Sequence, residues 1–454
     1  MRRGLHQLFV AAAAVALCAE PTYSEPLRLT PQEAIRLAME KSQRLMMAKS
    51  ELKQADERVR EARSEGLPQL DASVDYTRNW LLPTVTFNDQ TFKIGNDNNV
   101  AGGLSLTQSL YRGGGIRARL RAARLDVAVN AEVERAVRQQ VTADVENGFY
   151  DFILASELAR VSTLALERAR SNRRQVAALR QAGRASEYDL LRATVQVSSV
   201  RADSIRAHND REVAEIRLKD HIGLDLDRDI EVRGSFRESS SADGSDLQKL
   251  FAIAAARHPQ KRQLEYLIAM EERDIQAEKA ESRPRVDLVA DGRVQFQNDQ
   301  LDNAGNADEW RRSWSTGVRV QVPLFDGMQT GARVAQATEE RRRLRFEEEK
   351  LERAIERQIR ESWMDLQEAA ERIEVRRGTV EQATRGLGVA ESRYNSGVGT
   401  QLEILDAQLT LLEAETELAT AGRDRAAAIV AVELSAGILG ESAEIVSDGG
   451  VGAD

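Results

Sequence analysis

The chain has 454 residues, of which 42% are hydrophobic, 30% charged and only 5% aromatic, and its net charge is −9. This apolar share can bury a core, which excludes wholesale disorder, and many charges with only 8 prolines are typical of long helices. The acidic balance argues against a nucleic-acid partner, because nucleic acid requires a basic face.

Catalytic and metal-binding chemistry is excluded by the residues available. The single cysteine, Cys18, lies in the N-terminal targeting segment. His208, His221 and His258 show no metal-ligand spacing, so we expect them at helix surfaces or turns. The sequence has no phosphate-binding glycine motif and no GxSxG nucleophile motif. We therefore expect no enzyme, no metal site and no cofactor.

The N-terminus has the order of a secretory signal peptide, with two arginines, an apolar run over 8–17 and then small residues. Cleavage fits after Ala19 or after Ser24, and we assign 1–24 to the signal. Acylation of Cys18 stays open, although a bulky residue precedes it. No later stretch of about 18 residues is free of charge, so we expect a membrane-embedded part to be a barrel of strands.

The chain is an internal duplication. An offset of 214 residues, the difference between 324 and 110, aligns Leu110-Tyr111-Arg112-Gly113 with Leu324-Phe325-Asp326-Gly327. The same offset aligns Gly183 with Gly397 without a gap. Such self-similarity means that one structural plan occurs twice. We assign the first repeat to 25–233, a linker to 234–245, the second repeat to 246–440 and a flexible tail to 441–454.

Each repeat is expected to contain a helix, two strands, a long helix, a tight turn and a last helix. The expected helices are about 31–65, 115–181 and 187–222 in the first repeat, and about 246–281, 328–395 and 401–436 in the second. His258-Pro259 predicts a break near the start of the second set. In the first repeat Lys41-Ser42 occupies the equivalent position, which weakens the symmetry between the repeats at the helix start. The two shorter helices end to end would equal a long helix of about 100 Å.

Four strands are expected, at Leu70 to Arg78, Val100 to Leu110, Val286 to Phe296 and Ser315 to Leu324. Their alternation of apolar and polar residues is typical of a transmembrane barrel around water, and a soluble antiparallel sheet with one wet face gives the same pattern. Aromatic residues at strand ends favour the barrel. We expect the membrane girdle to contain Trp80, Trp310, Trp314 and Phe296.

Apolar residues recur every four positions from Val129 to Ile153 along the first long helix. A step of four drifts by about 40° around the helix, whereas a coiled-coil seam repeats every 3.5 residues. The pattern predicts a helix contacted on more than one side, and a two-stranded rod is the alternative.

The order of these elements and the turns from Arg180 to Leu191 and from Tyr394 to Gln408 resemble the outer-membrane efflux protein family, the TolC-like channel tunnels. The resemblance implies a mainly α fold with a transmembrane β part: three chains would form a 12-stranded β-barrel and a long α-helical barrel. It also implies an outer-membrane protein that extends into the periplasm, contacting lipid and acting as the passive exit duct of a tripartite efflux or type I secretion system. Its partners would be two further copies, a periplasmic adaptor that opens the tip and, directly or indirectly, an inner-membrane pump.

The two tight turns would be the periplasmic tips. By the resemblance, the adaptor-binding residues are Arg180, Gly183, Ser186, Tyr394, Gly397 and Thr400. Both glycines also fit left-handed helix C-caps.

Carboxylates follow each tip and would form rings in the pore that favour cations: Asp189, Glu403 and Asp406. Alternatively, they only complement helix dipoles. Many relatives hold the closed tip with a basic residue that the second turn lacks here. Arg184 or Arg192 is expected to substitute by pairing with Glu403 or Asp406, and reversing both charges should raise pore conductance.

Two other classes of protein keep part of this pattern. A periplasmic adaptor of the membrane-fusion type has one helical hairpin flanked by compact β domains, without duplicated strand pairs. An elongated coiled-coil scaffold would not need the four alternating strands.

Overall fold

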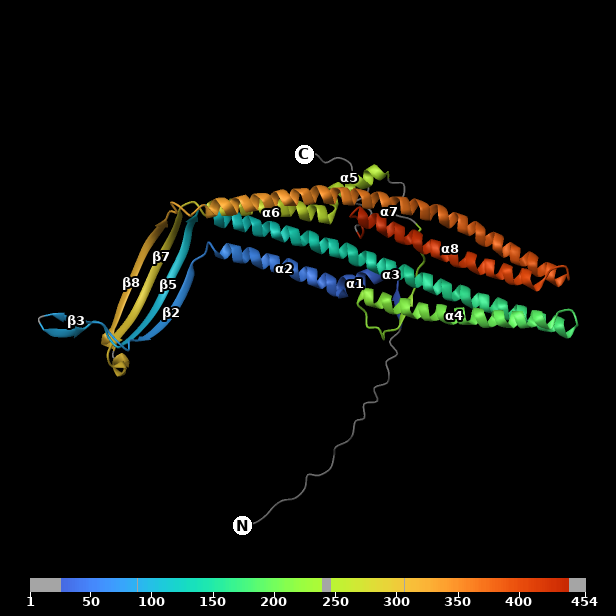
Figure 1. Cartoon of the computed structure of the whole chain (residues 1–454), viewed down its shortest axis with the longest axis horizontal. Helices are drawn as coiled ribbons and strands as arrows, with labels where there is room; N and C mark the ends of the chain where they lie inside the picture. Colours follow the sequence, from blue (N-terminus) through green and yellow to red (C-terminus); the bar gives the residue numbers. More distant parts are fainter. Residues whose placement is uncertain (1–25, 88, 239–245, 306, 441–454) are drawn as a thin grey trace, which may run out of the picture.

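A computed structural model of the chain describes residues 26–87, 89–238, 246–305 and 307–440. The predicted signal peptide with Cys18, the predicted tail and residues 239–245 of the predicted linker lie outside the described residues. Figure 1 shows an elongated molecule in which long helices run side by side, with a small sheet at one end and two tight helical turns at the other. None of the described helices combines the length and apolar character needed to cross a membrane.

Within the described residues, eight α-helices build the rod. They are α1 (Pro31–Lys41), α2 (Gln43–Ser64), α3 (Gly115–Gln181), α4 (Glu187–Ile222), α5 (Leu247–Arg257), α6 (Pro259–Ala280), α7 (Gln329–Asn395) and α8 (Gln401–Ser435). Both long helices have 67 residues, which confirms the expected length of about 100 Å. The element order repeats between the halves, as the duplication predicts.

The first helix of each repeat is broken at the equivalent position. His258 ends α5 with φ −60° and ψ 123°, and Ser42 ends α1 with φ −60° and ψ 119°. The Ser42 hydroxyl accepts a hydrogen bond from the Leu45 amide and so caps α2. The prediction that Lys41-Ser42 weakens the symmetry is therefore wrong, because a serine N-cap makes the same joint without a proline.

The sheet at one end is antiparallel, with strand order β2-β5-β7-β8. Its strands are β2 (Gln69–Arg78), β5 (Asn98–Arg112), β7 (Arg285–Asn298) and β8 (Trp310–Gln321), and the 3₁₀ turns η1 (Leu301–Gly305) and η2 (Ala307–Glu309) precede β8. The strands β3 (Thr84–Phe87) and β4 (Gln90–Lys93) form a projecting hairpin. A short parallel pair, β1 (Leu27–Leu29) with β6 (Ile230–Val232), lies near mid-length.

The register confirms the alternation. Asp71, Ser105, Asp291 and Ser315 lie in one row on the polar face, and the next row contains Leu70, Leu106, Ala290 and Thr316. The start of β8 corrects one expectation. Because β8 begins at Trp310, five residues before the expected Ser315, Trp314 lies inside the strand opposite Gly292 and not at its end.

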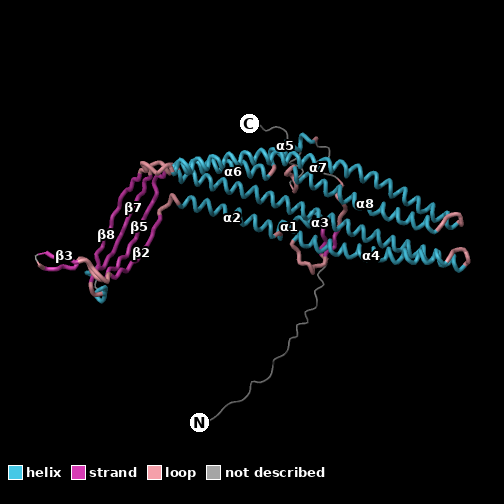
Figure 2. Tube along the Cα trace, in the orientation of Figure 1, coloured by secondary structure: helices cyan, strands magenta, loops and turns pink. Residues whose placement is uncertain are grey.

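Helix α3 is the centre of the packing, since it lies against α1, α2, α4, α6 and α8. This arrangement confirms contact on more than one side and excludes a two-stranded rod. Figure 2 shows the result as two helical hairpins, α3/α4 and α7/α8, pointing away from the sheet. Two hairpins and a four-stranded sheet also exclude the adaptor plan of a single hairpin.

The main core lies near mid-length of the rod. Phe149 of α3 is fully buried and packs with Leu29 of β1, Leu218 and Ile222 of α4, and Val430 of α8. This core joins the beginning, middle and end of the chain, so it fixes the direction in which the two hairpins leave. We call this region the waist.

Candidate functional site

The first tip is the turn between α3 and α4. Gly183 has φ +73°, and the amides of Gly183 and Arg184 donate to the carbonyls of Arg180 and Leu179 at 2.9 and 2.8 Å. This is the left-handed C-cap expected of glycine. Ser186 then caps α4 together with Asp189, whose carboxylate accepts from the Ser186 amide at 3.1 Å and from its hydroxyl at 2.6 Å.

The second tip, between α7 and α8, has the same geometry. Gly397 has φ +77°, and its amide donates to the Tyr394 carbonyl at 3.0 Å. Thr400 caps α8 by accepting from the Glu403 amide at 3.3 Å. Both predicted glycine C-caps are therefore confirmed. Asp189 and Glu403 serve the helix N-termini, as the dipole alternative expects.

Glu403 is held by a cation that was not predicted from the sequence, Arg393. The Arg393 guanidinium lies 3.1 Å from its carboxylate and holds the pKa of Glu403 below the ordinary value. On the first tip Arg180 pairs with Glu187 at 3.2 Å. Arg393 and Glu403 are ten residues apart, on either side of the turn at Gly397. That predicted turn brings the two helix ends together and could have indicated the pair.

The predicted link from Arg184 or Arg192 to Glu403 or Asp406 is absent from the described residues of a single chain. The Arg192 guanidinium instead stacks over the Tyr188 ring, 5.7 Å from its centre. A link between neighbouring copies stays a prediction. Asp406 is exposed and lines a groove of about 490 Å³ between α7 and α8, beside Glu403.

Polar contacts join the two hairpins above the tips. Arg168 of α3 binds both carboxylate oxygens of Glu415 on α8, each at 3.0 Å, and both side chains are partly buried. Nearer the tips, Gln175 of α3 donates to the side chain of Asn395 at the end of α7. Burial raises the pKa of Tyr394, and the Asp189 carboxylate of the other hairpin adds to the increase. Tyr394 and Asp189 were predicted as tip and pore residues, but none of these contacts between the hairpins was predicted, because each depends on how the hairpins align.

Apolar side chains are exposed at and beside both turns. Tyr188 and Leu191 of the first tip are 64% and 60% exposed, and Val398 and Leu402 of the second are 69% and 53% exposed. We call these four residues the apolar tip residues. Exposed apolar residues grouped at the end of a rod are typical of a contact surface for another protein.

The aromatic residues predicted for the girdle are placed differently from one another. Trp80 and Trp314 are 83% and 82% exposed. Phe296 is fully buried, with its ring 5.6 Å from that of Trp310, the first residue of β8. Trp310 also donates to the carbonyl of Ala304 in η1. Their membrane role stays a prediction.

A buried charge cluster at the waist was also missed. Arg237 binds Glu433 of α8 through two contacts of 3.0 and 2.7 Å, and Glu146 of α3 lies 3.7 Å from the same guanidinium. Burial raises the pKa of Glu146 above its ordinary value. Arg237 thus ties the segment after β6 to both α3 and α8.

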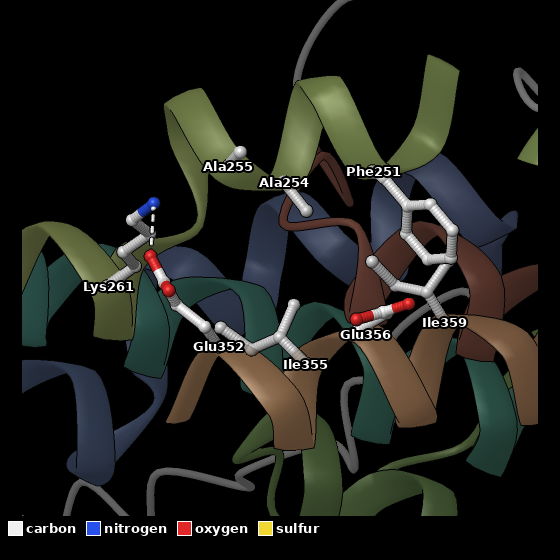
Figure 3. A pocket seen from close by; sticks show the side chains of 8 residues that line it. All are labelled: Phe251, Ala254, Ala255, Lys261, Glu352, Ile355, Glu356 and Ile359. Atoms are coloured by element: carbon white, nitrogen blue, oxygen red, sulfur yellow. Dashed lines mark ion pairs between the residues drawn. The ribbon is translucent and has the colours of Figure 1, made fainter. Parts of the chain in front are cut away.

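A second waist feature is the groove between α5 and α7 (Figure 3). Its volume is about 410 Å³, and Phe251 and Ala254 of α5 face Ile355 and Ile359 of α7. Lys261 and Glu352 close one end with an ion pair of 2.9 Å. This groove lies far along the rod from both tips and shares no residue with them.

A model of a known family, described as outer membrane efflux protein, matches residues 34–224 and 250–438. The alkaline protease secretion protein AprF of Pseudomonas aeruginosa is 24% identical over 402 residues, which cover 86% of this chain and 81% of AprF. The outer membrane protein TolC of Escherichia coli is 22% identical over 381 residues, which cover 80% of this chain and 73% of TolC.

Solved structures share the fold. The outer-membrane channel OprN superposes with a TM-score of 0.74 at 20% identity, over 90% of this chain and 89% of OprN. The outer membrane protein VceC of Vibrio cholerae superposes with a TM-score of 0.73 at 18% identity, over 90% of this chain and 96% of VceC.

Proposed function

The chain belongs to the outer membrane efflux protein family, and we propose that three copies form the passive exit duct of a tripartite efflux or type I secretion system. As a family member it is a non-enzymatic transport protein of the outer membrane that extends into the periplasm. In the proposed duct the repeats 25–233 and 246–440 each supply two strands and two helical columns.

The observation that carries the proposal is the pair of open edges of the sheet. Every residue of β2 is exposed, and so is every residue of β8 after Trp310. A sheet edge cannot remain unpaired in lipid, because its peptide groups have no water to bind. If β8 of each copy pairs with β2 of the next, three copies close a twelve-stranded barrel. The helices then close into a hollow cylinder of twelve columns.

We propose the two tips as the docking site of a periplasmic adaptor, with the inner-membrane pump contacted directly or through it. The support is the geometry of the turns, which present Arg180, Ser186 and Thr400 beside the apolar tip residues. Rigid C-caps at Gly183 and Gly397 hold these side chains on ordered backbone, which lowers the entropy cost of binding.

We propose that the closed state is held above the tips by the contacts between hairpins. Arg168 with Glu415 and Gln175 with Asn395 join α3/α4 to α7/α8, so moving one hairpin away from the other must break them. Asp406 is the favoured carboxylate for a cation-attracting ring, since it is exposed and no helix cap uses it.

Single-channel recording tests this function. Full-length protein purified from the outer membrane is reconstituted in a planar lipid bilayer, and we expect small, stepwise conductance from the closed resting state. The matched measurement uses the Arg168→Ala variant, which should conduct more. Trimeric protein that gives no conductance steps in either form would exclude a duct.

A further inference from the structure

The two open edges of the sheet carry charges of opposite sign on the same face. Asp71 and Asp75 lie on β2, and Arg311 and Arg319 lie on β8. The register puts all four on the polar face, because Asp71 shares a row with Ser315. All four are exposed, and among the described residues none of them makes an ion pair within its own chain.

We propose that Arg319 of one copy pairs with Asp71 of the next copy, and that this pair sets the register in which the chains close. The inference rests on the proposed trimer and adds to it the contact that aligns one chain with another. The β8 edge of each copy is thus covered by the β2 edge of the next copy.

Strand lengths restrict the register. Strand β2 has 10 residues and β8 has 12, so three antiparallel registers pair all of β2. Polar faces must meet polar faces, which removes the middle register, because a slip of one residue turns every side chain over. In the first remaining register Asp71 is opposite Arg319. In the second it is opposite Gly317, with Arg319 as its diagonal neighbour, still within reach of a long side chain.

Within the chain, the carboxylate nearest to Arg319 across the sheet already has other partners. Asp287 of β7 is its direct neighbour across the sheet. The Asp287 carboxylate, however, accepts from the Ser109 hydroxyl at 2.9 Å and pairs with Arg112 at 3.4 Å. The carboxylate that is free to pair with Arg319 is therefore Asp71 of the next copy, across the open edge, and not Asp287 of the same chain.

The pattern fits a second copy of this chain, because each copy presents one acidic and one basic edge. Pairing β2 with β2 would bring Asp71 and Asp75 against like charges, which is destabilising. Pairing β8 with β2 is a head-to-tail contact that uses two different surfaces and closes into a ring when the rotation allows. Charge therefore disfavours dimers of like edges and favours the ring.

Cysteine cross-linking tests the contact directly, because the only native cysteine is Cys18 in the predicted signal peptide. Full-length protein with Asp71→Cys and Arg319→Cys is oxidised in the membrane and run on a denaturing gel. We expect covalent dimers and trimers from this pair or from Asp71→Cys with Gly317→Cys, according to the register. The control pair, Asp71→Cys with Ser313→Cys, should remain monomeric on the gel.

Charge exchange gives a second test. Arg319→Glu and Asp71→Arg should each weaken the trimer by about tenfold or more in its equilibrium with monomer, since the pair occurs three times. The double variant should recover most of the loss. Arg293→Glu, on the same face of the inner strand β7, should leave the trimer intact.

The outcomes separate the two proposals. A wild-type protein that is monomeric in detergent overturns the exit duct and this contact together. A trimeric wild type without cross-links from either cysteine pair, or with a double variant as weak as both single changes combined, overturns the contact alone.

Discussion

Arg168 joins the two helical hairpins of a chain through a bidentate pair with Glu415. A partly buried, bidentate, charge-assisted contact of this kind contributes about 1.5–3 kcal/mol. We expect Arg168→Ala to raise the closed-state conductance several-fold. Arg160→Ala is the matched control, because Arg160 pairs with Glu157 one turn away on the same helix. Equal conductance of both variants would show that the hairpin contact does not hold the closed state.

The three carboxylates predicted for the pore differ in their surroundings. Asp189 completes a capping box, whereas Asp406 is exposed and serves no cap. We expect Asp406→Asn to reduce the preference for cations over anions, measured as reversal potential across a salt gradient. Asp189→Asn should instead lower the unfolding temperature through a cost of about 1 kcal/mol. If Asp189→Asn changed the ion selectivity and Asp406→Asn did not, the assignment of the ring to Asp406 would be wrong.

His258 predicts a pH dependence of stability. Burial, reinforced by the positive charge of Arg135, lowers its pKa to about 4. The folded chain therefore holds this histidine neutral, and the stability it contributes is present above about pH 6.5 and lost as the pH falls toward 4. We expect a loss of about 3 kcal/mol over that interval, reduced in His258→Gln.

Thermal unfolding between pH 7 and pH 4 measures the difference. His208→Gln is the control, because His208 is exposed on α4 and should keep the wild-type pH profile. Identical pH profiles for wild type and His258→Gln would mean that His258 does not cause the acid sensitivity.

Residue-level features were predictable where they depend on residues close together in the sequence. The glycine C-caps at Gly183 and Gly397 follow from turn chemistry and were predicted correctly, whereas the N-cap roles of Ser186 and Thr400 were not predicted. Arg168 gave no local signal, since its partner lies 247 residues away. Such a pair requires the axial alignment of two hairpins, which depends on packing at the waist.

At the scale of elements, the break at Ser42 is the most testable feature. Ser42 has the extended backbone that a following proline requires, and Pro259 occupies the corresponding first position of α6. We expect Gln43→Pro to leave stability unchanged or to raise it by up to about 1 kcal/mol.

The control is Lys53→Pro in the interior of α2, which should cost about 3 kcal/mol or more. Unfolding temperatures of the two variants measure the contrast. If Gln43→Pro were as damaging as Lys53→Pro, the two joints would not be equivalent.

The helices were predicted more accurately than the strands. Proline-free windows and glycine turns define α3 within a residue at each end. β8 was placed five residues late, because Trp310-Arg311-Arg312 interrupts the apolar alternation that marked the rest of the strand. The small hairpin of β3 and β4 lies between two expected strands and was not predicted, since four-residue strands carry too little pattern to be recognised.

At the scale of the whole molecule, the sheet and the helices both require further copies of the chain. The described part of one chain supplies an open four-stranded sheet and an open layer of helices, and no described element closes either of them. The duplication predicted this plan because each half repeats two strands and two columns. The contact between copies was not predictable from one repeat, since it depends on which strands become the edges.

The mass of the assembly is the first property to measure, because the exit duct requires three copies of the chain. Protein extracted from the outer-membrane fraction is separated by size exclusion, and light scattering gives its mass after the detergent is subtracted. We expect three times the mass of the mature chain. A monomer or dimer, or protein released from the cells without detergent, would contradict the proposed trimeric duct.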